Sequence, residues 1–184
     1  MANNPMGLDF IEGVLGVVNI NFNNVDLGKT LDEATLEFIE DIKDIMYAQD
    51  GTQPQDKVPT GQAYQVTCKI AQPTWLRLKE LMRGVTTSPD GHSALLGANL
   101  YLSGKDNFAK VLTLTRVDSD GVSSAVLEYK MTFYKAFPMV TSPVGTFGPD
   151  TQRSVDVTFY IFRDSAHGGN FGYSGHASSL GTGV

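Results

Sequence analysis

Gly28-Lys29-Thr30 has the residue types that close a phosphate-binding loop, in which backbone amides and a lysine hold phosphate oxygens. That loop requires another glycine five residues before Gly28. Asn23 occupies this position instead. Acidic residues follow the segment directly, and they would repel a triphosphate. The segment therefore predicts a turn that exposes a lysine, and it does not predict a nucleotide site.

Asp118-Ser-Asp120-Gly121 has the carboxylate spacing that begins a calcium-binding loop. A complete loop places another oxygen ligand at its fifth position and a glutamate at its twelfth. Val122 and Tyr129 stand at these two positions, so the ligand set is broken. The segment predicts a hairpin turn.

Other reactive residue types lie in patterns that do not support catalysis. His92, His167 and His176 lie in Gly/Ser-rich segments without the spacing of zinc ligands. Cys68 is far from them, and its place in the alternating run 64–70 predicts a small buried side chain. Residues 172–175 lack the second spacer of a nucleophile elbow. We expect no catalytic residues, no cofactor and no metal, and hence no enzyme.

Length and charge narrow the class of protein. The 184 residues fit one domain, and a single cysteine excludes an intrachain disulfide framework. Residues 1–60 carry 11 acids and 3 bases, a net of −8, whereas residues 61–184 carry 9 acids and 11 bases, a net of +2. The overall charge of −6 argues against binding of nucleic acid through contacts with its phosphates.

Periodicity predicts several strands and one short helix. Apolar residues at Trp75, Leu78, Leu81 and Met82 form a helical stripe, which Gly84 ends. Alternating patterns predict strands at 18–22, 62–70, 95–103, 110–117, 125–136 and 154–163, with loops at 85–92 and 138–152. The runs 110–117 and 125–136 flank the Asp118 turn and predict a hairpin.

Residues 30–48 fit two structures. Thr30 with Glu33 is a capping-box pattern, and the apolar residues that follow recur at helical spacing. Taken alone, this segment favours a helix. The alternative is a pair of strands, roughly 35–40 and 41–48.

The predicted fold is mainly β, a β-barrel or sandwich with one short α-helix. We expect an N-terminal arm at 1–12, a β domain at 13–164 and a mobile Gly/Ser-rich C-terminal tail at 165–184. No apolar run approaches the roughly 20 residues of a membrane span, and the N-terminus lacks the pattern of a signal peptide. The chain is therefore expected to be soluble and made in a cytoplasm.

The order of these features resembles the major tail tube proteins of tailed bacteriophages. The resemblance covers roughly residues 13–164. It rests on Asn-Asn-Val-Asp-Leu-Gly-Lys-Thr at 23–30, the loop Asp-Gly-Thr-Gln-Pro-Gln-Asp-Lys-Val-Pro-Thr-Gly at 50–61, Thr-Trp-Leu at 74–76, Phe-Tyr-Lys-Ala-Phe-Pro at 133–138 and a closing strand that ends at Asp164. None of these segments is a catalytic signature.

The resemblance implies a structural subunit that closes into rings, usually of six copies, which stack into a hollow tube. The sheets would extend between subunits, and the segment matching 33–48 would be a strand hairpin that extends the wall of the lumen. DNA would pass through this lumen during ejection without specific binding. Implied partners are further copies of the chain and other tail proteins: a tape measure, a baseplate and, in a contractile tail, a sheath. The expected location is the tail of a virion assembled in the host cytoplasm.

The physics of a conduit agrees with the composition. Duplex DNA carries one negative charge per about 1.7 Å of axis, so a basic bore would hold it and an acidic bore would let it slide. Six copies at −6 each give −36 per ring. Candidate lumen residues are Asp41 and Asp44, and without a bulge only one of them can face the bore. The loop 49–61, the N-terminal arm and the C-terminal tail are candidates for contact between rings. The candidate loop residues are Asp50, Gly51, Pro54, Asp56, Pro59 and Gly61.

Other functions stay open at this point. A tube subunit of a contractile injection or type VI secretion machine would share the same features. A β-sandwich binding or virion-decoration module would present exposed aromatic residues in loops, for which Tyr101, Phe108 and Phe147 are the candidates. A hydrolase that uses two acidic residues lacks any recognisable triad or metal pattern.

Overall fold

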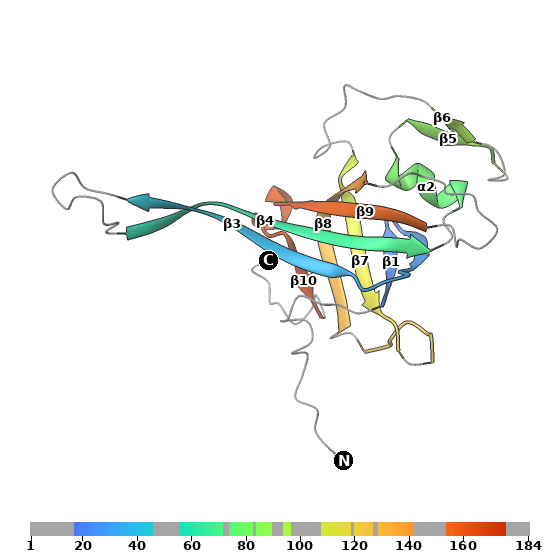
Figure 1. The fold of residues 1–184 in the computed structure, drawn as a ribbon, viewed down its shortest axis with the longest axis horizontal. Coiled ribbons are helices and arrows are strands. Elements are labelled where there is room, and N and C mark those ends of the chain that lie inside the picture. The colour runs from blue at the N-terminus through green and yellow to red at the C-terminus, as the bar shows by residue number, and fades with distance from the viewer. Residues whose placement is uncertain are drawn as a thin grey trace, which may run out of the picture.

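A computed structural model describes residues 17–45, 56–71, 74–82, 84–89, 94–96, 108–118, 120–126, 129–141 and 154–175. Within these ranges the chain is mainly β with a single short α-helix, as predicted (Figure 1). The elements are β1 (Val18–Phe22), β2 (Val25–Lys29), β3 (Thr35–Ile45), β4 (Asp56–Ala71), α2 (Trp75–Leu81), β5 (Val85–Thr87), β6 (Ala94–Leu96), β7 (Lys110–Arg116), β8 (Lys130–Val140), β9 (Ser154–Phe162), the 3₁₀ helix η3 (Ser165–His167) and β10 (Gly172–Ser174).

One antiparallel sheet organises the described residues, with strand order β2-β1-β7-β8-β9-β4-β3 and with β10 added beside β8. The sheet curls back on itself, because Thr30 at the end of β2 forms a bridge with Ile70 of β4. Thr30 is buried, and its hydroxyl accepts a hydrogen bond from the Val18 amide at 3.2 Å. A single curled sheet is nearer to a barrel than to a sandwich of two sheets.

The core fills the inside of this curl. Alternate residues of β1 are buried, and Phe22 packs against Phe159 of β9 with ring centroids 5.6 Å apart. Period-two alternation places the apolar side chains of each strand on one face, and this face is the concave one. The largest fully buried side chains come from six elements: Phe22, Phe159, Ile20, Leu27, Ile70, Leu78, Leu112, Leu114, Val18, Val66, Val155 and Val157.

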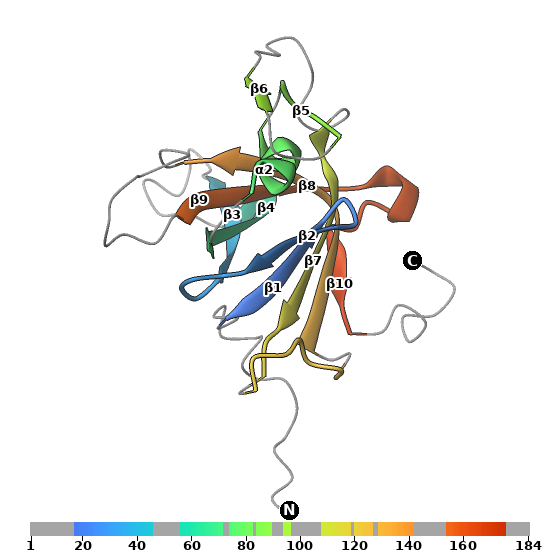
Figure 2. The same cartoon turned by 90° about the vertical axis from the view of Figure 1, so that its right-hand side faces the viewer.

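Helix α2 covers one end of the curl (Figure 2). Leu78 and Leu81 are buried, and Trp75 and Met82 pack against the core, so the predicted apolar stripe is confirmed. The helix ends at Leu81, because Met82 is extended with φ −112° and ψ 123°, and Gly84 follows with a φ of 82°, a left-handed conformation that glycine adopts at little cost. The predicted burial of Cys68 is also confirmed, and burial raises the pKa of its thiol to about 12.

Residues 35–45 form one strand, so the helix favoured by local spacing is wrong. Thr30 uses its hydroxyl to join β1 and therefore does not cap a helix. The expected hairpin within 33–48 also needs correction. β3 runs unbroken from Thr35 to Ile45, and its hairpin partner is β4, with Thr35 opposite Thr67 and Ile45 opposite Asp56. Eleven cross-strand partners outweigh the weak helical preference of the segment.

Several further boundaries differ from the predictions. The expected loop at 85–92 begins with β5, which pairs with β6, and the expected loop at 138–152 begins inside β8. The expected tail at 165–184 is wrong at its start. Residues 165–175 pack against β8 through η3 and β10, while 176–184 lie outside the described residues. Strands 18–22 and 154–162 are confirmed, and so is the pairing of β7 with β8 in a hairpin, although β8 spans Lys130–Val140 rather than the predicted 125–136.

Within the described residues, no helix has the length and apolar character needed to cross a membrane.

We predict that Gly172→Ala destabilises the protein by about 1–3 kcal/mol or more, the usual cost of forcing atoms into a packed site. A Cβ at Gly172 would lie 2.2 Å from the backbone oxygen of Thr132, so β10 could not approach β8. Urea unfolding measures the change. The control is Ser174→Ala in the same strand, where the side chain is exposed and little change is expected. Equal stability of the two variants would contradict this packing.

Candidate assembly surface

The outer parts of β3 and β4 project from the body of the protein as a two-stranded ribbon (Figure 1). We define the ribbon as residues 35–45 and 56–63. From Tyr64 onward β4 pairs with β9 on its second side, but before Tyr64 its only strand partner in the described chain is β3. An isolated two-stranded ribbon is at best marginally stable in water. The ribbon is therefore supported less by strand pairing than the rest of the sheet.

Both edges of the ribbon are open in the described chain. β3 is the last strand of the sheet, so its outer edge has no strand partner from Thr35 to Ile45. Such an edge presents a row of unpaired backbone donors and acceptors to another strand. Eleven residues is long for an exposed edge, and natural proteins usually shorten, cover or pair such strands.

Apolar side chains are exposed on both faces of the ribbon. Phe38 and Ile42 share one face and are 51% and 54% exposed. Ile39 lies on the opposite face and is also exposed, as is Val58 of β4. Single exposed apolar residues are ordinary, but a group of them on a projecting element makes it a candidate contact surface.

Polar pairs across the ribbon maintain its register. Glu40 accepts a hydrogen bond from Gln62 at 2.9 Å, and the Lys57 ammonium lies 3.5 Å from Asp44. Exposed pairs of this kind contribute little stability each. The acidic members of these pairs also contribute to a negative charge on the ribbon. β3 carries four acidic residues and one lysine, a net of −3: Glu37, Glu40, Asp41, Asp44 and Lys43.

The structure does not bring Asp41 and Asp44 together. The pairing shifts register where Asp41 is opposite Gly61 and Ile42 is opposite Pro59, so the extra residue lies in β4. Alternation along β3 is unaffected, and the two carboxylates stay on opposite faces. Asp41 lies over Gly61, where a Cβ would be 3.3 Å from its Oδ2. At most one of the two can face a common bore.

The predicted inter-subunit loop is largely strand where it is described. Asp56, Pro59 and Gly61 belong to β4, which corrects the expected loop at 49–61. Proline is tolerated there because the strand is bulged and its second edge is open. Asp50, Gly51 and Pro54 lie outside the described residues, so their predicted role as contacts stays a prediction.

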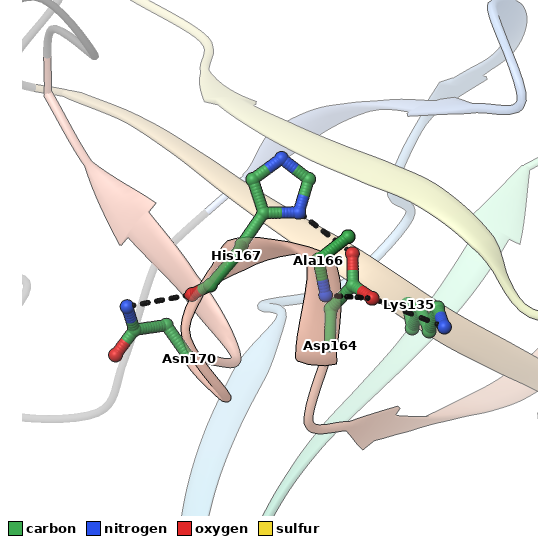
Figure 3. A network of polar contacts seen from close by, with 5 residues as sticks. All are labelled: Lys135, Asp164, Ala166, His167 and Asn170. Carbon is green, nitrogen blue, oxygen red and sulfur yellow. Dashed lines mark hydrogen bonds and ion pairs between the residues drawn. The ribbon is translucent and has the colours of Figure 1, made fainter. Parts of the chain in front are cut away.

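A compact turn at residues 163–171, which we call the clasp, joins β9 to β10. Asp164 is its polar centre (Figure 3). Its Oδ2 lies 2.6 Å from Nδ1 of His167, and its Oδ1 lies 3.1 Å from the Lys135 ammonium and accepts the Ala166 amide at 3.3 Å. The Asn170 side-chain amide donates to the His167 carbonyl at 2.8 Å. The Asp164 side chain is only 7% exposed, so these partners replace water around a buried charge.

A bulge in β8 makes this network possible. Lys110 is opposite Ala136, but Leu112 is opposite Phe133, so β8 contains an extra residue between Phe133 and Ala136. A bulge bends the strand and changes the direction in which its side chains point. Here Lys135 reaches Asp164, and Tyr134 stacks on His167 with ring centroids 3.8 Å apart.

The clasp keeps β9 and β10 in line along β8. β9 ends opposite Lys135, the Phe171 carbonyl accepts the Tyr134 amide at 3.0 Å, and β10 begins with Gly172 opposite Phe133. The clasp was not predicted from the sequence. The available signal was Asp164 before a short polar segment, followed by Gly168-Gly169, which both adopt positive φ.

The described residues contain no group of three or more histidine, cysteine, aspartate or glutamate side chains that could hold a metal ion. Asp118 and Asp120 lie in the turn between β7 and β8, and Asp120 accepts the Val122 amide at 2.9 Å, as expected for a simple turn. Lys29 donates to the Gly121 carbonyl. The Lys29 ammonium is thus engaged with this turn. Of the predicted histidines only His167 is described, and its contacts belong to the clasp.

No protein-family model matches the chain, and a search of curated proteins finds no match.

We predict that Asp164→Asn lowers stability at neutral pH and that acid removes the difference from the wild type. Hydrogen bonds from His167 and Lys135 lower the pKa of Asp164 from 3.8 to about 2. A lowered folded-state pKa stabilises the fold above the unfolded pKa, and this stabilisation is lost as the pH falls from about 4 towards 2. Urea unfolding at several pH values measures it.

The matched control is Asp120→Asn in the exposed β7–β8 turn, where the amide oxygen can still accept the Val122 amide. Its stability should run parallel to that of the wild type across this pH range. A parallel curve for Asp164→Asn as well would contradict a role of the ionised clasp in stability.

Proposed function

We propose that this chain is a structural subunit of a phage tail tube, whose copies form stacked rings around a lumen that conducts DNA. The observation that carries the proposal is the ribbon, with its open edges and exposed apolar side chains. A subunit that completes its sheet with strands of neighbouring copies would satisfy both features at once. The resemblance of residues 13–164 to major tail tube proteins points to the same assembly, with six copies per ring.

The charge of the ribbon fits a conduit. A net of −3 on β3 places repeated negative charge along whatever surface the ribbon forms. Phosphate would be repelled from such a wall, so DNA could pass without being held. In this proposal the protein performs no catalysis. Its partners are further copies and other tail proteins, and its location is the virion tail.

Purified protein at high concentration should form rings or tubes visible by negative-stain electron microscopy. Ile39→Glu should raise the concentration at which they appear at least tenfold, about 1.4 kcal/mol, because a charge replaces an apolar contact. The free subunit should keep its stability within about 0.5 kcal/mol, as is usual for exposed positions.

Val122→Glu is the matched control, since Val122 is 61% exposed and lies in the β7–β8 turn away from the ribbon. It should assemble like the wild type. Protein that stays monomeric at every concentration and salt condition would contradict the proposal.

Single charge reversals should identify the carboxylate that faces the bore. Because Asp41 and Asp44 lie on opposite faces of β3, only one of Asp41→Lys and Asp44→Lys should make assembled tubes retain duplex DNA. Retention should weaken steeply as salt rises, which is the sign of phosphate contacts. DNA co-sedimentation with tubes at 50 and 200 mM salt measures this. Retention by neither variant, in tubes that assemble normally, would contradict a lumen-facing ribbon.

A further inference from the structure

A groove of about 300 Å³ opens where the ribbon leaves the sheet. We call it the fork groove. Leu36 and Tyr64 line it from the root of the ribbon, Met131 and Phe133 from β8, and Phe171 and Tyr173 from the clasp and β10. These side chains are mostly apolar. The groove is about ten times larger than the roughly 30 Å³ share of one liquid water, so it can receive a side chain.

β10 presents an open strand edge beside this groove. The residues on either side of β10 are hydrogen-bonded to β8: the Phe171 carbonyl accepts the Tyr134 amide, and the Gly175 amide donates to the Lys130 carbonyl. In an antiparallel pair the bonded positions alternate. By this register Gly172 and Ser174 direct their backbone groups away from β8, where no other described strand pairs with them.

The rim of the groove is aromatic and carries a positive charge. The rings of Phe38 and Tyr64, and those of Tyr64 and Phe171, have centroids 5.0 Å apart. The Arg163 guanidinium lies 5.3 Å from the Phe171 ring centroid and donates to Gln62 at 3.1 Å. None of the described residues that line the groove is acidic. An apolar strand with acidic neighbours would therefore find complementary charge here.

The exposed residues of the ribbon match this description but cannot reach the groove of their own chain. Ile42 lies four residues beyond Phe38, which is about 13 Å at roughly 3.3 Å per residue. The ribbon runs away from the body, whereas the groove lies at its root (Figure 1). Glu40 and Asp44 lie two residues on either side of Ile42, on the same face of β3, and supply the negative charge that would face Arg163. A second copy of the chain can present the same ribbon from outside.

We propose that the fork groove binds the ribbon of a second copy, with Ile42 entering the groove and the ribbon edge pairing with β10. This rests on the proposed function and assigns its receptor. The contact joins two different surfaces of the same molecule, so it is heterologous and leaves a pair of copies with one free ribbon at one end and one free groove at the other. Such contacts close into a ring or continue as a filament.

A thiol cross-linking experiment tests the proposal on the full-length protein. The double variant Ile42→Cys/Ser174→Cys is concentrated until it assembles and is treated with a short bismaleimide. Ser174 is exposed and lines the groove. Wild-type protein is the blank, because Cys68 is buried and the pKa of its thiol is raised to about 12.

Denaturing gels should show a ladder of covalent oligomers for the double variant, because each heterologous contact links one copy to the next. Each single variant should give much less product. The control pair Ile42→Cys/Val122→Cys, with an exposed position away from the groove, should give at least several-fold less of the ladder.

Rings or tubes that form without this ladder would overturn the groove proposal and leave the tube function standing. They would point to another occupant, such as residues 1–16 of the same chain. Covalent dimers that never extend would also overturn it, because they indicate a two-fold contact. A protein that never assembles would overturn both proposals.

Discussion

The central feature of the structure is one long strand, β3, whose outer edge makes no backbone hydrogen bonds to another described strand. β3 pairs with β4 along its whole length on one side and with no described strand on the other. Backbone donors and acceptors are obligatory hydrogen-bonding groups, so an edge of this length is satisfied either by water or by another strand. The exposed apolar residues on both faces disfavour water as the permanent neighbour. This combination is what supports the proposed assembly.

The rest of the chain gives the ribbon a rigid base. β4 is fixed to β9 over Tyr64–Ala71, and the bridge between Thr30 and Ile70 ties it to the start of the sheet. On the other flank the clasp lets β10 continue along β8 after β9 has ended. The ribbon and β10 then diverge, and the fork groove is the space between them. A projecting element and an open groove thus arise from the same sheet.

Sequence periodicity predicted the elements that bury one face at a regular spacing of residues. β1 and β9 alternate clearly, and α2 shows its stripe because one face packs on the core. β3 could not be settled this way, since its apolar residues also fit a helix and its stabilising partner begins at Asp56. The clasp was not predicted, because it also depends on residues that are distant in the sequence. Asp164 acquires its role only when the bulge of β8 brings Lys135 beside it.

Hydrogen–deuterium exchange of β3 tests most directly whether its open edge is completed by another copy. The amides that point outward from Thr35–Ile45 should exchange quickly in dilute monomer and become strongly protected in the assembled state. Amides in β1 and β9, which are paired on both sides within the chain, should change little. Protection that stays equally low in assembled particles would show that the edge remains free, and it would contradict the account.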